Sequence, residues 1–377
     1  MAVKASGNQL AFSEIGEEFG LAPNPSGSGY SLGAYRITQT VATLSNLGLD
    51  NNTNNPPTSI MPQGNSTIRI SDFYSKKLNT IVNLHTSDQD NTTRKDIRDR
   101  YNSNNVTVVG GFRTRPIDSG EAPPTGVRGK RVIGLINVTI GSEQSSSKSR
   151  CAVQTGTWDA NTTFEVNIGS SGRVIGACGN GGNGGGCGNG NAPNHATSGL
   201  GIEYAGTRLI NNGRIQCGYG GGGGGGRASC DPNKSTNDPI APGGGGGAGA
   251  GYPFGSGGNG GCDSGGCGGN GGTGSYTTRG GGGAGVVDGC ATGGTGGAGG
   301  QPGNNPQSGG NGNDTYGPAC ERIGGTPGYS GDAIRATVSS GNVTIVTAGT
   351  IHGGQVYSTC LLYTSPSPRD RGCSRMP

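Results

Sequence analysis

Runs of glycine constrain this chain more than any other feature. Of its 84 glycines, 62 lie between residues 172 and 331, although glycine loses more backbone entropy on folding than any other residue. A flexible linker is the ordinary interpretation of such tracts. These runs instead have similar lengths, contain little serine and are separated by chemically distinct loops. They are Gly218–Gly226, Gly243–Gly251, Gly255–Gly261, Gly265–Gly274, Gly280–Gly285 and Gly293–Gly300.

Close packing of backbones explains the runs better than a linker does. We expect polyproline-II-like segments, which have three residues per turn and no internal hydrogen bonds. Their N–H and C=O groups would pair with neighbouring segments, because buried backbone groups need partners. Only glycine lets backbones approach on every side. The sequence therefore predicts a mainly β and irregular protein in which residues 172–331 form a C-terminal antiparallel bundle of polyglycine-II helices.

The composition excludes several classes of protein. Only 29% of the residues are hydrophobic and 5% aromatic, which is too little for one continuous core. The net charge of +4 is dispersed without a run of Lys or Arg, so we expect no nucleic-acid partner. The sequence has no signal peptide and no apolar stretch of the ~20 residues that a membrane helix needs. We therefore expect no membrane insertion.

The remaining parts of the chain are organised around strands. Residues 1–77 repeat the pattern apolar-x-apolar-Ser-acid-apolar at Leu10–Ile15 and Ile68–Phe73, which favours a small N-terminal attachment module of strands that run into short helices. Residues 78–171 contain alternating Val, Ile and Thr and predict a β-rich domain. Residues 332–359 are expected to be closing strands. Residues 360–377 resemble a translated sequencing adapter and are excluded from the fold.

A second repeat leads into the glycine runs. Phe164–Gly179 and Ile202–Gly218 both read strand, turn, GRV or GRI, then a cysteine and a glycine, and Val343–Gly353 echoes the pattern. The repeat predicts strand pairs that bracket the glycine runs and cap their base.

Loop chemistry follows from the direction of the runs. If successive runs are antiparallel, alternate loops lie at the same end. Each loop of one end holds one cysteine and at least one acidic residue. These loops are Arg227–Pro242, Cys262–Ser264, Val286–Thr292 and Asn313–Ile323. The loops of the other end, Tyr252–Phe254, Ser275–Arg279 and Gln301–Ser308, hold neither a cysteine nor an acid. Disulfides, free thiols and a zinc site remain alternatives for the clustered cysteines. These are Cys230, Cys262, Cys290 and Cys320.

The same loops supply candidate receptor-binding residues. A glycine scaffold offers no side chains, so contact has to come from loop tips. Tyr and Arg are the side chains that most often carry binding energy, and acids suit hydroxyl-rich or cationic groups. The candidates are Asp231, Lys234, Asp238, Asp263, Asp288, Asp314, Tyr316 and Arg322.

Catalytic and metal-binding patterns are missing from the sequence. The three histidines lie far apart without metal-ligand spacing, and no GxSxG elbow, P-loop or defensible carboxylate pair occurs. Gly309–Gly317 fits one calcium-binding nonapeptide, but such sites need tandem copies. We expect neither an enzyme nor a bound metal or cofactor.

Two blocks of residues carry a family resemblance. LAFSEIGEEFG and ISDFYSKKLN resemble the start of virion structural proteins of tailed bacteriophages, and GRVIGACGNGGNGG and GRIQCGYGGGGGGG are similar to the strand-to-glycine transitions of phage tail-fibre adhesins. In that family a polyglycine-II sandwich presents variable loops to a host receptor. The number of cysteines departs from the family pattern.

The resemblance implies a protein of the virion tail fibre. Its expected partners are a host cell-surface polysaccharide or outer-membrane protein and other tail-fibre or baseplate proteins, and a homotrimer is compatible with it. The alternative is an extracellular glycine-rich structural or ice-binding protein. Long, charged loops of unequal length favour the adhesin, because an ice binder needs short loops and one flat, regular face.

Overall fold

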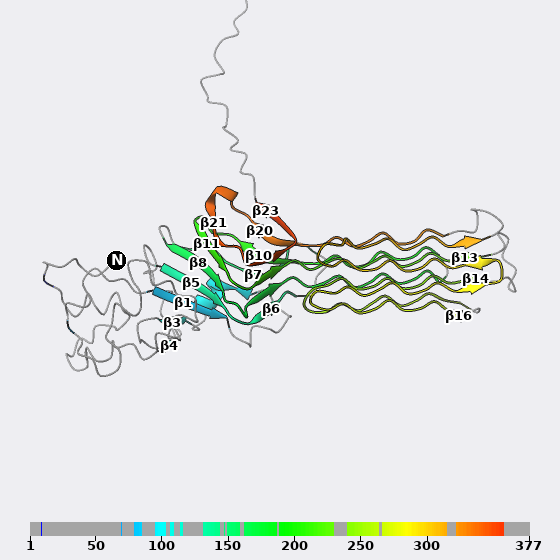
Figure 1. Ribbon diagram of the computed structural model, residues 1–377, viewed down its shortest axis with the longest axis horizontal. Helices are drawn as coiled ribbons and strands as arrows, with labels where there is room; N and C mark the ends of the chain where they lie inside the picture. The colour runs from blue at the N-terminus through cyan, green and yellow to red at the C-terminus, as the bar shows by residue number, and fades with distance from the viewer. Residues whose placement is uncertain are drawn as a thin grey trace, which may run out of the picture.

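The computed structural model shows a body of β-sheets from which a long glycine-rich region extends to one side (Figure 1). It describes Gln9, Arg69 and residues 79–84, 95–102, 106–108, 114–115, 131–143, 147, 149–158, 162–186, 188–229, 240–263, 266–314 and 322–357. Apart from Arg69, the N-terminal repeats Leu10–Ile15 and Ile68–Phe73 lie outside the described residues.

Three sheets make up the body, and most of their strands are parallel. The first has the order β21 (Val343–Thr347), β11 (Thr207–Asn211), β8 (Thr163–Ile168), β5 (Arg131–Ile136), β1 (Asn79–Leu84), then antiparallel β3 (Val106–Val108) and β4 (Thr114–Arg115). The second has the order β2 (Lys95–Asp96), β7 (Cys151–Gln154), β10 (Ser198–Ile202), β20 (Asp332–Ala336), β23 (Gly354–Tyr357). The third has the order β22 (Thr350–His352), β12 (Arg214–Gln216), β9 (Arg173–Ile175), β6 (Thr139–Gly141).

The chain visits the three sheets in a fixed order, once per coil. Successive coils are β5-β6-β7, β8-β9-β10, β11-β12-β20 and β21-β22-β23, and each strand pairs in parallel with its counterpart in the next coil. This is the winding of a parallel β-helix. Phe164–Gly179, Ile202–Gly218 and Val343–Gly353 therefore repeat because each contains the first corner of a coil.

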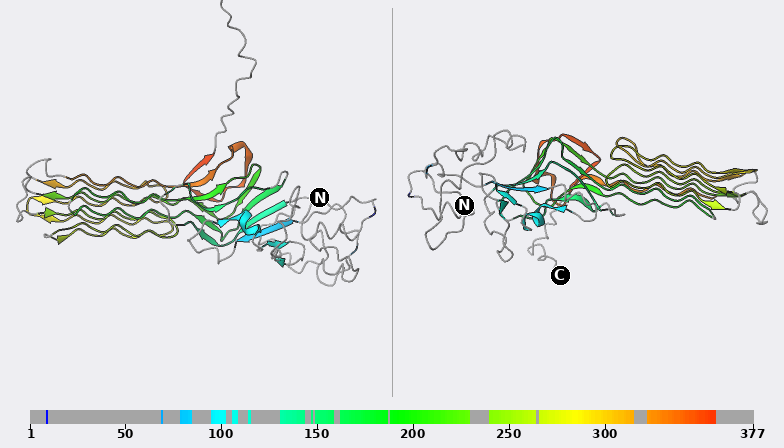
Figure 2. Two further views of the ribbon diagram at one scale, coloured as in Figure 1. Left: turned by 180° about the vertical axis from the view of Figure 1, so that it is seen from behind. Right: turned by 90° about the horizontal axis from the view of Figure 1, so that it is seen from below.

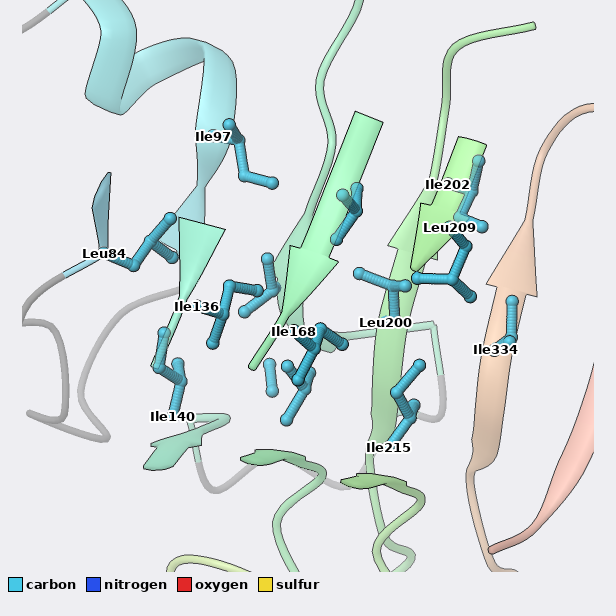
Figure 3. Packing of buried hydrophobic residues seen from close by; sticks show 14 of the residues in the cluster. Leu84, Ile97, Ile136, Ile140, Ile168, Leu200, Ile202, Leu209, Ile215 and Ile334 are labelled. Atoms are coloured by element: carbon cyan, nitrogen blue, oxygen red, sulfur yellow. The ribbon is translucent and has the colours of Figure 1, made fainter. Parts of the chain in front are cut away.

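Stacking of equivalent residues forms the core of the body. Leu84, Ile136 and Ile168 are register partners on neighbouring strands, and each is at most 2% exposed. Figure 3 shows them within a larger aliphatic cluster. Phe164 closes one side by stacking on Trp158, with ring centroids 4.8 Å apart. Each fully buried aliphatic side chain contributes about 1.5–3 kcal/mol to the stability of the fold. The hydrophobic residues, too few for one core along the whole chain, thus form a core within the body.

Helical structure is scarce in the described residues. They contain one α-helix, α4 (Ile97–Asn102), and one 3-10 helix at Ser340–Asn342. The side chain of Asp96 caps α4, because its Oδ1 accepts a hydrogen bond of 2.8 Å from the N–H of Arg98. Neither of these helices in the described ranges is long and apolar enough to span a membrane.

The glycine-rich region, called here the glycine array, consists of residues 176–197 and 217–331. The first part connects β9 to β10 and the second connects β12 to β20, so both leave the same corner of successive coils. Segments run away from the body and return to it. In both views of Figure 2 the segments of the array run side by side away from the sheets of the body.

Hydrogen bonds in the array join neighbouring segments at every third residue. From Gly243–Gly251, one set of N–H groups donates to Gly185, Gly182 and Gly179, a second to Gly294 and Gly297, and a third to Gly269 and Gly272. Most of these segments have a close backbone on several sides. A Cβ on Gly246 would lie 2.0 Å from the carbonyl oxygen of Gly222, so any residue other than glycine has to displace backbone there.

The fold class expected for the C-terminal part is wrong. The described residues between 172 and 331 contain no helix, and the protein is strand-rich with parallel sheets rather than one that ends in a bundle of polyglycine-II helices. The array is built from extended segments that donate to their neighbours, with short antiparallel pairings at the turns. Glycine composition permits close approach of backbones, but it does not by itself impose a helical winding.

Candidate functional site

The end of the array furthest from the body, called here the distal end, carries short antiparallel strands. They are β13 (Ala228–Ser229) with β14 (Ile240–Ala241), β15 (Cys262–Asp263) with β16 (Gly266–Cys267), and β17 (Val287–Asp288) with β18 (Ala291–Thr292) and β19 (Asn313–Asp314). Figure 1 shows β13, β14 and β16 together at this end. The chain reverses direction across each of these antiparallel pairings.

A small apolar cluster holds two of these sheets together. Ala228, Ala241 and Ala291 are fully buried, and Val286 and Cys290 pack against them. Ala228 and Ala241 face each other across β13 and β14, while Ala291 belongs to β18. The cluster therefore fixes the β13–β14 hairpin against the β17–β18–β19 sheet with very little side-chain volume.

The distal cysteines are oxidised where they are described. Cys262 forms a disulfide with Cys267, five residues further on, which closes the β15–β16 hairpin. Cys290 is also disulfide-bonded. Cys230 and Cys320 lie outside the described residues. Among the described residues, no group of three His, Cys, Asp or Glu side chains is placed to hold a metal ion.

A different class of cysteine lies in the body and where the array leaves it. Cys151 on β7, and Cys178 and Cys217 at the start of the two parts of the array, are buried thiols outside any disulfide. Burial raises the pKa of the Cys178 and Cys217 thiols to about 12. Since the thiolate is the reactive form, these two cysteines are unreactive at neutral pH.

Four of the receptor-binding candidates lie in described parts of the distal end. Asp288 and Asp314 belong to the same three-stranded sheet, on β17 and β19, whereas Asp263 lies on the separate β15–β16 hairpin. Asp263 and Asp288 are half-buried and Arg322 is exposed. The backbone of Arg322 is fixed by hydrogen bonds, since its N–H donates to Arg227 and its carbonyl accepts from Gly312. Asp231, Lys234, Asp238 and Tyr316 lie outside the described residues.

Sequence reasoning missed three side chains at this end. Val287 is 71% exposed and Ile323 is 66% exposed, and large exposed aliphatic side chains of this kind suit a binding surface. Arg227 is instead only 7% exposed, and its Nε has no hydrogen-bond partner among the described residues. A buried guanidinium group normally has a partner. Its position directly after a seven-glycine stretch was the available signal, because packed glycine segments leave little room for a charge.

The turns at the opposite end are attached to the body. Tyr252, Phe254 and Tyr276 form an aromatic cluster with ring centroids 4.9–5.6 Å apart. The guanidinium of Arg173, on β9, lies 5.9 Å from the ring of Tyr276, and Gln216 of β12 donates a hydrogen bond of 2.6 Å to its carbonyl oxygen. Burial raises the pKa of the Tyr276 phenol above its ordinary value. This cluster joins the array to the β-helix.

These features define a class of protein: a parallel β-helix whose glycine insertions carry a set of turns to one distal end. No protein-family model and no curated protein matches the chain. Among solved structures it is similar to the crystal structure of the gp37-gp38 adhesin tip complex of the bacteriophage S16 long tail fiber. The identity is 17%, the match covers 94% of this chain and 100% of that chain, and the TM-score is 0.42.

Proposed function

We propose that this chain is a tail-fibre adhesin of a tailed bacteriophage, and that its distal turns bind a receptor on the host cell surface. The observation that supports it most is the contrast between the two ends of the array. Near the body, the turn that contains Tyr276 is held by Arg173 of β9 and Gln216 of β12, whereas the distal end carries Val287 and Ile323, which are exposed to solvent. A scaffold of glycine segments then serves to hold these turns away from the body.

The chemistry of the distal end suggests the kind of receptor. Exposed aliphatic side chains lie next to charged ones in the sequence, as in Val287–Asp288 and Arg322–Ile323. Such a mixture suits a cell-surface polysaccharide or an outer-membrane protein, because apolar contact supplies area and charged groups orient the partner. In this proposal the protein belongs to the virion, residues 1–77 attach it to other tail-fibre or baseplate proteins, and it is not an enzyme.

Replacing the distal loops tests the proposal. In one variant short Gly-Ser turns replace residues 231–239 and 315–319, so that Cys230 and Cys320 are kept, and Val287 and Ile323 are changed to Ser. In a matched control Gly-Ser turns replace residues 302–307 in a turn near the body. We expect the distal variant to lose binding to host cells and the control to keep it. Both variants should retain a protease-resistant array. Full cell binding by a folded distal variant would contradict the assignment.

A further inference from the structure

The side of the glycine array contains a groove of about 700 Å³. Its walls are residues 191–194 and 256–259, and the segment Asn180–Asn183 lies between them. That segment is hydrogen-bonded to both walls, because Asn191 donates to the carbonyl of Asn183, and Gly181 donates to the carbonyl of Ser256. Asn180–Asn183 is therefore the floor of the groove.

Two asparagine side chains, three residues apart, bond the floor to one wall of the groove. The Oδ1 of Asn180 accepts a hydrogen bond of 3.0 Å from the N–H of Ser256, and the Oδ1 of Asn183 accepts one of 2.9 Å from the N–H of Asn259. Each amide oxygen thus takes the place that a neighbouring backbone carbonyl has elsewhere in the array.

The floor differs from the packed glycine segments. Where those segments pack against each other, even a Cβ meets backbone at about 2 Å, as at Gly181 against Gly246. Asn180 and Asn183 instead carry whole side chains, which bond to the N–H groups of Ser256 and Asn259 in the wall. The groove is therefore a surface feature with its own chemistry.

Amides dominate that chemistry. The lining residues of the groove are Asn, Ser, Gly, Ala and Pro, with no charged and no aromatic side chain among the described residues that line it. Asn191 and Asn194 on one wall are exposed. An asparagine amide has two donors and an acceptor, so a row of amides matches a ligand that carries both donors and acceptors and no charge.

We propose that this groove binds a neutral, hydroxyl-rich chain, that is, a stretch of an uncharged polysaccharide. Hydroxyl groups donate and accept hydrogen bonds as amides do, and repeating sugars place them along an extended axis parallel to the floor. The volume is in the range of small-molecule sites. The site is separate from the distal end and does not depend on the proposed function.

Affinity electrophoresis tests the proposal on the full chain, with dextran, soluble starch and linear mannan in the gel as probes. The test variant is Asn191→Ala with Asn194→Ala. These side chains are exposed, and the wall bonds of Asn180 and Asn183 stay intact. The control variant is Asn304→Ala with Asn305→Ala, at two exposed asparagines of a turn near the body. We expect at least one probe to retard the wild type, about tenfold weaker binding for the test variant and unchanged binding for the control.

Three results would overturn the proposal: retardation by none of the neutral probes, equal retardation of the test variant and the wild type, or stronger retardation by dextran sulfate that salt abolishes. The distal-loop replacement described above separates this site from the receptor site. It should leave retardation unchanged, and its effect on cell binding tests only the proposed function.

Discussion

In the β-helix body, buried side chains of neighbouring strands lie over one another, as Leu84, Ile136 and Ile168 do. In the glycine array most buried positions are glycine, and the contacts there are between N–H and C=O groups of adjacent segments. The body gains stability from apolar area. The array is instead held by hydrogen bonds between backbone groups of neighbouring segments. Such bonds are required because an unpaired buried N–H or C=O group costs free energy.

The difference reverses the expected effect of adding or removing a methyl group. Removing carbon from the body opens a cavity, whereas adding carbon to the array forces backbones apart. A long region can therefore be closely packed without an apolar core, provided that its residues are small enough for backbones to meet.

Gly246→Ala should destabilise the array by about 4 kcal/mol or more, because the new Cβ lies 2.0 Å from the backbone of Gly222 and neither segment has room to move. Denaturant unfolding combined with limited proteolysis measures the effect. Gly281→Ala is the matched control, since a Cβ there has nothing within 4 Å, and its effect should stay within about 0.5 kcal/mol. Equal stabilities of the two variants would contradict the close backbone packing at Gly246.

Ile168→Ala should destabilise the body by about 3 kcal/mol, because Ile168 is fully buried between coils and the cavity cannot refill from its rigid neighbours. Thermal unfolding followed by circular dichroism measures it. Val346→Ala on β21, where the side chain is 46% exposed, should change stability by less than 1 kcal/mol or so. A larger loss at Val346 than at Ile168 would contradict the described core.

Removing the Cys262–Cys267 disulfide with Cys262→Ser and Cys267→Ser should cost about 2 kcal/mol, because the bond closes a short loop. The loss should be confined to the distal end, where it can be measured as faster amide exchange in β15 and β16. Reductant should reproduce the result in the wild type. Unchanged exchange would show that the hairpin is held by its backbone alone.

Asn183→Ala should cost about 1 kcal/mol, since it removes one side-chain acceptor for the N–H of Asn259. The exchange rate of the Asn259 amide measures the loss directly. Asn191→Ala is the control, because its exposed side chain lies on the other wall. If Asn259 exchanges at the wild-type rate in Asn183→Ala, the asparagine is not acting as a substitute carbonyl.

Sequence patterns predicted where strands lie better than which strands pair with each other. The alternation in Thr162–Ile168 and the GRV and GRI repeats marked strands and corners that the structure contains as β8, β9, β11 and β12. The parallel winding was not predicted, because an isolated strand does not specify its partner. The long insertion between β12 and β20 also separates two strands of one coil in the sequence.

At the distal end, the sequence left the bonding of the cysteines open. A cysteine's partner depends on the local hairpin, and Cys262 bonds to Cys267 across β15 and β16. The assignment of all eight candidate residues to a receptor site stays a prediction, and Asp231, Lys234, Asp238 and Tyr316 lie outside the described part of the chain. The burial of Arg227 and the exposure of Val287 depend on packing between segments, which composition does not report.

Amide hydrogen exchange along Gly243–Gly251, compared with β8 and β11, tests most directly whether the glycine array is as ordered as the body. The N–H groups of this run donate to three different neighbouring segments. Exchange of one of these amides therefore requires the packed segments to separate. The account predicts protection of the glycine amides comparable to that of the β-helix strands. Exchange of those amides at the rate of an unstructured chain, while β8 and β11 stay protected, would contradict it.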